Sequence, residues 1–260
     1  MGSIVALGYL AGAIAILGDA AQRQVQIEPI IKKVINAAGG EERLRQIKAA
    51  QWETKGIYNL GGTLHAAIAE ETLIQAPNFQ STLWTSDFGD GIPMTNLSVI
   101  NRDGAWVRRS SDDGKSVNTE PMTADEVVDS LERAHILTLT YNPFSLTEKT
   151  LQLNIVHPAG APRSGLVAIK VSHPKYREVT LYYDKKTGLL RQRDAYEFVG
   201  MFPKRQLVQT HFGRHKEVDG ITVPLKSISY YNQYPFLHLE LVRGKTFNQT
   251  LEESRFKKPD

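Results

Sequence analysis

The sequence predicts a mainly β protein of the α+β class. We expect a strongly curved antiparallel sheet of about ten or eleven strands, with helices against its concave face. Apolar and polar side chains alternate over many short runs, Asp-Gly and Gly-Gly dipeptides separate these runs, and few segments have helical spacing. Period-two alternation between such turns is typical of antiparallel strands that bury one face.

The clearest strands lie in residues 177–232, which read as four strands joined by turns. Apolar side chains occupy every second position in residues 179–183, and residues 184–188 form a turn. The alternation resumes after the Asp219-Gly220 turn. Further strands are expected at residues 51–58, 63–73, 79–86, 97–101, 105–109, 115–119, 151–157, 165–173 and 236–242.

Three segments have the spacing of helices. Residues 29–38 and 41–48 are expected to form two short helices before the first strand. The third helix interrupts the strands. Thr123 and Glu126 match a capping box, in which a hydroxyl and a carboxylate bond free amides of the first helical turn. We expect this helix to continue to about residue 139.

Composition excludes several classes of protein. The chain has 260 residues with 41% hydrophobic and 23% charged residues, which is ordinary for a globular protein. Its net charge is +3 without any basic run, so a nucleic-acid partner is not expected. The absence of cysteine excludes disulfides, thiolate metal sites and a cysteine nucleophile. No linker divides the chain, so residues 22–260 are predicted to form one domain.

The N-terminus resembles an export signal. Residues 4–17 carry no charge, and this run is shorter than the roughly 20 apolar residues of a membrane span. Gly18 and Ala20 supply the small residues of a cleavage site, although no basic residue precedes the run. We therefore predict a signal-peptide-like segment over residues 1–21. A membrane anchor or a buried helix is the alternative.

Motifs for catalysis are lacking. The sequence has no phosphate-binding loop, no G-x-S-x-G and no H-E-x-x-H. His211 and His215 have the nearest metal-ligand spacing, but an extended strand would hold them roughly 13 Å apart and no third ligand accompanies them. The neighbouring acids Glu70 and Glu71 would point to opposite faces of a strand. We expect no catalytic residue, no metal site and no cofactor, and we do not expect an enzyme.

Large aromatic side chains concentrate on the expected strands, and two interpretations remain open. Most aromatic residues in sheets belong to an ordinary core. They could also line a cavity that binds an acyl chain or another apolar ligand. The residues alone do not separate these interpretations.

The order of five motifs resembles a known family. The motifs are INAAGGEERLRQIKAAQWETKGIY (35–58), NRDGAW (101–106), LYYDKKTGLLRQR (181–193), EVDGITVPLKSISYYN (217–232) and FKKP (256–259). Together with the signal-like start, they resemble the LolA/LolB-like superfamily of bacterial periplasmic lipoprotein carriers, in its divergent outer-membrane lipoprotein-sorting-like group. The resemblance spans nearly the whole chain after residue 21.

This resemblance implies an unclosed β-barrel whose helices cover an apolar concavity. It implies a periplasmic, non-enzymatic carrier of lipids or lipidated proteins with a role in outer membrane biogenesis. Its partners would be a lipid or acyl chain, a lipoprotein, or a membrane-bound donor or acceptor protein. One alternative is an envelope sensor on the same scaffold that passes a signal to a membrane partner. A hydrolase with an unrecognised site is a further alternative, but no nucleophile lies beside a base.

In the carrier interpretation, the inward faces of the strands form the cavity wall and the helix over residues 124–139 forms a lid. The residues expected in the wall are Trp52, Phe79, Trp84, Trp106, Tyr196 and Phe198. Those expected to form the lid surface are Val127, Val128 and Leu131.

Overall fold

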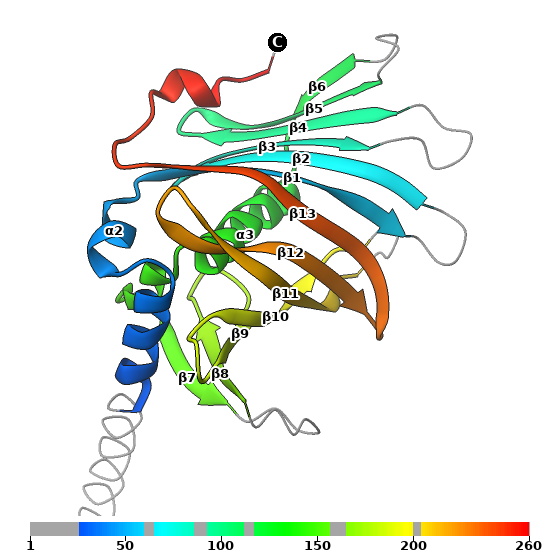
Figure 1. Ribbon diagram of the computed structural model, residues 1–260. Helices are drawn as coiled ribbons and strands as arrows, with labels where there is room; N and C mark the ends of the chain where they lie inside the picture. The colour runs from blue at the N-terminus through cyan, green and yellow to red at the C-terminus, as the bar shows by residue number, and fades with distance from the viewer. Residues whose placement is uncertain are drawn as a thin grey trace, which may run out of the picture.

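A computed structural model describes residues 26–59, 65–85, 93–111, 117–156, 165–199 and 204–259. The predicted signal-peptide-like segment, residues 1–21, lies outside this part of the chain. The described residues form a single antiparallel sheet of thirteen strands (Figure 1). Thirteen strands form rather than ten or eleven, because each turn-bounded run pairs as a strand of its own.

The strands are β1 (Ala49–Asn59), β2 (His65–Gln75), β3 (Asn78–Thr85), β4 (Met94–Asn101), β5 (Gly104–Ser111), β6 (Val117–Pro121), β7 (Gln152–Val156), β8 (Leu166–Ser172), β9 (Val179–Asp184), β10 (Leu190–Glu197), β11 (Gln206–Val218), β12 (Ile221–Tyr231) and β13 (Tyr234–Phe247). The helical segments are residues 26–37, α2 (Glu41–Gln46), α3 (Ala124–Tyr141) and two 3₁₀ turns, η1 (Pro143–Thr147) and η2 (Glu253–Phe256).

The strand order is β6-β5-β4-β3-β2-β1-β13-β12-β11-β10-β9-β8-β7. The first strand, β1, lies at the centre of the sheet, and β2 to β6 follow it in order to one edge. After α3 the chain continues with β7 at the opposite edge, and β8 to β13 lead back to the centre, where β13 pairs with β1. Between the two edges runs α3, which crosses the concave side (Figure 1). Because β6 and β7 do not pair, the sheet stays unclosed in the described residues. The predicted unclosed barrel with helices against its concave face is confirmed.

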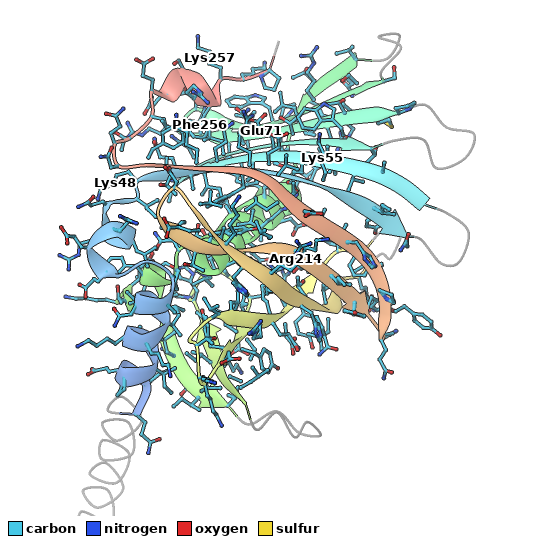
Figure 2. The ribbon with its side chains drawn as sticks, in the orientation of Figure 1. Lys48, Lys55, Glu71, Arg214, Phe256 and Lys257 are labelled. Atoms are coloured by element: carbon cyan, nitrogen blue, oxygen red, sulfur yellow. The ribbon has the colours of Figure 1, made fainter. Side chains whose placement is uncertain are left out.

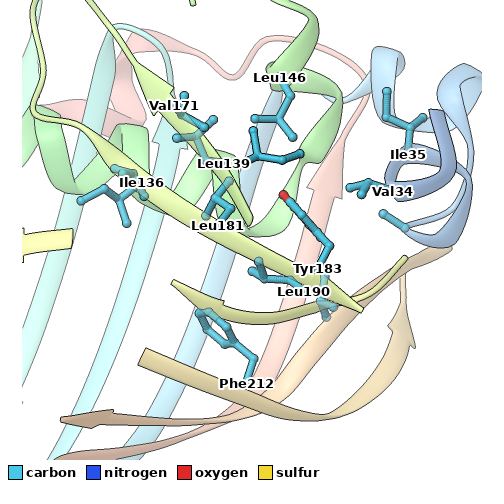
Figure 3. Packing of buried hydrophobic residues seen from close by; sticks show 14 of the residues in the cluster. Val34, Ile35, Ile136, Leu139, Leu146, Val171, Leu181, Tyr183, Leu190 and Phe212 are labelled. Atoms are coloured by element: carbon cyan, nitrogen blue, oxygen red, sulfur yellow. The ribbon is translucent and has the colours of Figure 1, made fainter. Parts of the chain in front are cut away.

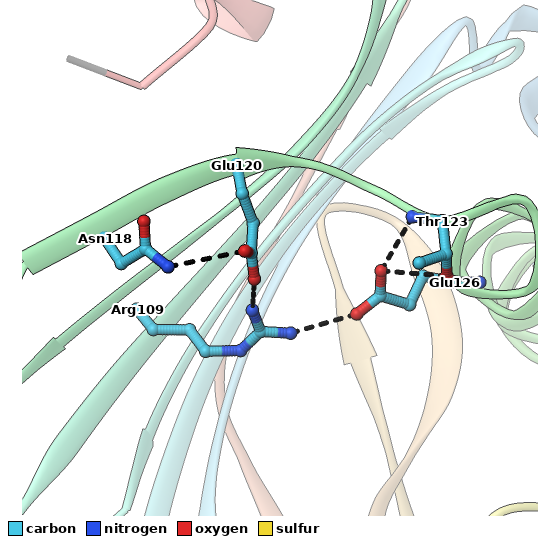
Figure 4. Close-up of polar contacts among 5 residues, drawn as sticks. All are labelled: Arg109, Asn118, Glu120, Thr123 and Glu126. Carbon is cyan, nitrogen blue, oxygen red and sulfur yellow. Dashed lines mark hydrogen bonds and ion pairs between the residues drawn. The ribbon is translucent and has the colours of Figure 1, made fainter.

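The start of α3 is fixed by the predicted capping box (Figure 4). The Thr123 hydroxyl accepts a hydrogen bond from the Glu126 amide at 3.3 Å, and the Glu126 carboxylate accepts one from the Thr123 amide at 2.8 Å. Arg109 of β5 bonds the same carboxylate at 2.9 Å and also pairs with Glu120 of β6. The helix is therefore tied to the edge of the sheet from which it departs.

Buried side chains fill part of the concavity. Val34 of the N-terminal helix, Leu139 of α3 and Leu181 of β9 all belong to the largest buried cluster (Figure 3). The N-terminal helix packs into this cluster through Ile31 and Val34, and just after the helix the Ala38 carbonyl accepts a hydrogen bond from the Thr222 amide at 3.0 Å. Here the aromatic and aliphatic residues form an ordinary core.

Two smaller clusters lie on opposite faces of β2–β4. On the concave face, Phe79 packs with Ile74 and Ile100 against α3. On the outer face, Leu73 and Val99 pack against Phe256, which comes from the C-terminal segment (Figure 2). The sheet is thus covered by α3 on one side and by the end of the chain on the other.

Candidate ligand-binding cavity

A cavity of about 660 Å³ lies between α3 and the sheet. Its walls come from β1, β2, β3, α3 and β10 to β13, and most of the larger side chains are apolar. These apolar side chains are Trp52, Tyr58, Ile68, Leu83, Ile136, Leu137, Tyr141, Tyr196, Phe198, Phe212, Phe236, Leu237 and Leu239.

Aromatic side chains mark the mouth of the cavity. Tyr196 and Phe198 are 52% and 51% exposed, so they lie where the cavity meets solvent. The Arg205 guanidinium lies over the Phe198 ring, 4.8 Å from its centroid. Such a contact holds an exposed ring in place while one face stays accessible.

Ion pairs fasten α3 over the cavity from both sides. Arg133 of α3 pairs with Glu70 of β2. Across the cavity, Arg205 pairs with Asp129 and Glu132 of α3, at 2.8 Å for Glu132. Glu70 and Glu132 are both buried, and burying a charged group is costly unless it is paired. These ion pairs therefore tie α3 to the sheet on both sides of the cavity.

Arg193 of β10 is a charged residue in the lining of the cavity. Its guanidinium bonds the hydroxyls of Thr140 at 3.5 Å and Thr210 at 3.3 Å, and the carboxylate of Glu197 at 2.7 Å. It also lies 5.9 Å from the centroid of the Phe212 ring. The Nε atom of Arg193 is buried and has no hydrogen-bond partner among the described residues.

A second cavity of about 260 Å³ lies beyond the first and shares Trp52, Leu137 and Tyr141 with it. The rings of Trp52 and Tyr141 stack with their centroids 4.5 Å apart. Burial raises the pKa of Tyr141 to about 12, so its hydroxyl is neutral at physiological pH. The stacked rings form a wall between the two cavities.

The structure brings together three of the six residues expected in the cavity wall. Trp52, Tyr196 and Phe198 line the cavity, whereas Phe79 is buried in the core under α3. The other two, Trp84 and Trp106, follow the alternation to the outer face. Leu83 and Thr85 on either side of Trp84 line the cavity, and Trp106 pairs with Val99 of the outer-face cluster.

The three expected lid residues lie on a different side of α3 from the cavity. Val127 and Leu131 pack against the Phe79 cluster, and Val128 is exposed. The charged residues of the cavity were not predicted from the sequence. Helical spacing could have found Glu132, because it lies one turn before the buried Ile136. No local signal distinguishes Arg193 or Arg205 from solvent-exposed arginines.

Within the described residues, no group of three or more histidine, aspartate or glutamate side chains is arranged to hold a metal ion. Among the helices of those same ranges, none combines the length and the apolar character that crossing a membrane requires.

Comparison with known proteins gives matches of structure only. No protein-family model matches the sequence, and no curated protein matches it either. The structure is similar to that of a DUF1329 family protein from Desulfovibrio piger, with a TM-score of 0.52 and 12% identity over 89% of this chain and 97% of that chain. At 12% identity, this match shows that the two chains share a fold.

Two other solved structures are also similar to this chain. A putative outer membrane lipoprotein-sorting protein domain from Vibrio parahaemolyticus has a TM-score of 0.46 and 12% identity, over 84% of this chain and 94% of that chain. A LolA superfamily protein from Nitrosomonas europaea has a TM-score of 0.48 and 9% identity, over 86% and 96%. At these identities the likeness concerns the fold and not the ligand.

Proposed function

We propose that this protein is a non-enzymatic carrier of lipids or lipidated proteins in the bacterial periplasm. The observation that carries the proposal is the cavity of about 660 Å³ under α3, with largely apolar walls and aromatic rings at its mouth. Its volume falls within the range of about 300–1,000 Å³ typical of small-molecule sites. An acyl chain is the ligand that suits such walls.

Apolar burial alone can supply the affinity of a carrier. Each methylene group moved from water into the cavity contributes about 0.8 kcal/mol. Part of this energy is offset by the lost motional freedom of the ligand. A chain of a dozen or more methylene groups would still bind well without any bond-making step. A carrier needs no catalytic residue, and the sequence offers no nucleophile beside a base.

In this proposal α3 governs uptake and release. The ion pairs of Arg133 and Arg205 hold the helix over the cavity. A membrane-bound donor or acceptor protein that competes for these charges would loosen the cover. The periplasmic location is proposed from the signal-like residues 1–21.

Ligand binding by the delipidated protein tests the proposal. We expect a fluorescent fatty acid to bind and native mass spectrometry to detect lipid in the protein as purified. Ser227 lines the cavity, so Ser227→Trp should fill it and weaken binding at least tenfold. The matched control is Lys226→Trp on the same strand. Lys226 pairs with Glu240 at 3.4 Å, and both side chains are solvent-exposed.

The proposal fails if the delipidated protein binds no fatty acid, or if Ser227→Trp binds as tightly as the control. Capture of a membrane protein by both variants, independent of lipid, would instead support the sensor alternative.

A further inference from the structure

We infer that Arg193 forms a subsite in the cavity for the anionic head group of a single-chain amphiphile, such as a long-chain carboxylate. The inference rests on the proposed function, because it concerns the ligand of the same cavity. It adds a polar specificity that an apolar cavity alone does not provide.

The position of Arg193 is the first argument. The residue is 8% exposed and lines the cavity, so its charge faces the ligand space rather than bulk water. A guanidinium has five N–H donors, and a buried donor without a partner is costly. Two of its bonds, to Thr140 and Thr210, are long at 3.5 and 3.3 Å, and Nε has no partner among the described residues. This group has capacity for a further acceptor.

The counter-ion of Arg193 is the second argument. The side chain of Arg193 is 9% exposed, but that of its partner Glu197 is 34% exposed. Glu197 can therefore turn into water at little desolvation cost while a ligand anion takes its place. The other guanidiniums of the cavity, Arg133 and Arg205, each have a buried carboxylate as a partner. A ligand anion that displaced either of these carboxylates would leave it buried without that cation, which is costly.

The wall next to Arg193 is the third argument. One row of cross-strand neighbours runs from Arg193 through Thr210 and Ser229 to Leu237 and Tyr58. The row is charged or hydroxylated on β10 to β12 and apolar or aromatic on β13 and β1. An amphiphile with its head at Arg193 would lay its chain along the apolar end. A charge-assisted pair is directional, so it would also fix the orientation of the chain.

The test compares three ligands of equal chain length: hexadecanoate, hexadecyl phosphate and hexadecanol. Their affinities are measured by displacement of a fluorescent probe from the delipidated protein. We expect the wild type to bind at least one anion roughly tenfold more tightly than the alcohol, because hydrogen bonds to charged groups are the stronger ones. The two anions decide whether the subsite takes a carboxylate or a phosphate.

Two variants assign the preference to Arg193. Arg193→Met should bind the anion and the alcohol with about equal affinity. Glu197→Gln should raise the affinity for the anion several-fold, because it removes the competing carboxylate. Lys226→Met removes an outer-face cation and should leave the preference for the anion unchanged. If Arg193→Met does not fold, Glu197→Gln alone decides, because it keeps the guanidinium.

Equal binding of anion and alcohol by the wild type would overturn the inference while the carrier proposal stands. The inference also fails if Glu197→Gln weakens anion binding, or if Arg193→Met keeps the anion preference. Failure of all three ligands to bind would overturn the carrier proposal, and the inference with it.

Discussion

Glu126 shows how one side chain can fix the start of α3. Hydrogen bonding from the Thr123 amide, with smaller contributions from the Thr123 hydroxyl and Arg109, lowers the pKa of Glu126 below its ordinary value of 4.5, against an opposing effect of burial. Since the folded-state pKa is lowered, the ionised carboxylate stabilises the fold at pH values above 4.5. This contribution is lost as the pH falls through the lowered pKa.

Glu126→Gln should therefore be less stable than the wild type at neutral pH, and the difference should shrink in acid. Urea unfolding at a series of pH values measures it. A pH-independent difference would contradict this account. Thr123→Ala is the companion variant, and it should cost about 1 kcal/mol through the lost cap.

Gly244 of β13 is required by the Trp52 ring that separates the two cavities. A Cβ atom at Gly244 would lie 2.4 Å from a carbon of that ring. The ring cannot move away easily, because Tyr141 stacks against it. Gly244→Ala should destabilise the protein by about 1–3 kcal/mol through overpacking and should shift the tryptophan fluorescence.

Gly213→Ala is the matched control for Gly244→Ala. Gly213 is also in a strand, β11, and a Cβ atom there would have nothing within 4 Å. If the two alanine variants were equally stable, the Trp52 ring would not require glycine at position 244, and this account would be wrong.

At the scale of the element, the ion pairs of α3 predict how readily this helix separates from the sheet. Arg205 and Glu132 are 13% and 7% exposed, so removing the cation leaves a buried carboxylate. Arg177 also bonds Glu132, at 2.6 Å, and offsets part of the loss. Arg205→Met should cost about 3 kcal/mol and speed amide hydrogen exchange in α3.

The control for Arg205→Met is Arg45→Met. It removes an ion pair with Glu41 in which both side chains are solvent-exposed. We expect a change within about 0.5 kcal/mol there. Unchanged exchange of α3 in Arg205→Met would show that the ion pairs do not fasten the helix.

Local patterns were sufficient to predict the elements but not which face of each strand turns inward. Alternation and turn dipeptides located the strands, and the Thr123 capping box located α3. Phe79 and Trp84 are five residues apart, so a regular strand points them to opposite faces and they cannot share one wall. Which of them faces inward depends on α3 and the C-terminal segment, which are distant in sequence. Arg193 and Arg205 escaped prediction for the same reason.

At the scale of the whole molecule, the two faces of the sheet differ in what covers them. The concave face carries the cavity under α3. The outer face of β2–β4 is covered by the C-terminal segment, where Asn101 donates a hydrogen bond to the Phe256 carbonyl at 2.7 Å. This segment follows β13 and crosses back over the first half of the sheet, so it joins the two halves (Figure 1).

This division predicts that stability and ligand binding can be changed independently. Phe256 is fully buried away from the cavity, so Phe256→Ala should lower the free energy of unfolding by about 3–5 kcal/mol with unchanged fatty-acid affinity in the fraction that stays folded. Phe198 is half exposed at the mouth, so Phe198→Ala should weaken binding several-fold and leave the unfolding midpoint within a few degrees. Urea unfolding and probe displacement on both variants give the comparison. Equal losses of affinity in the two would mean that the outer face and the cavity are coupled through the sheet, and stability and binding could not be changed independently.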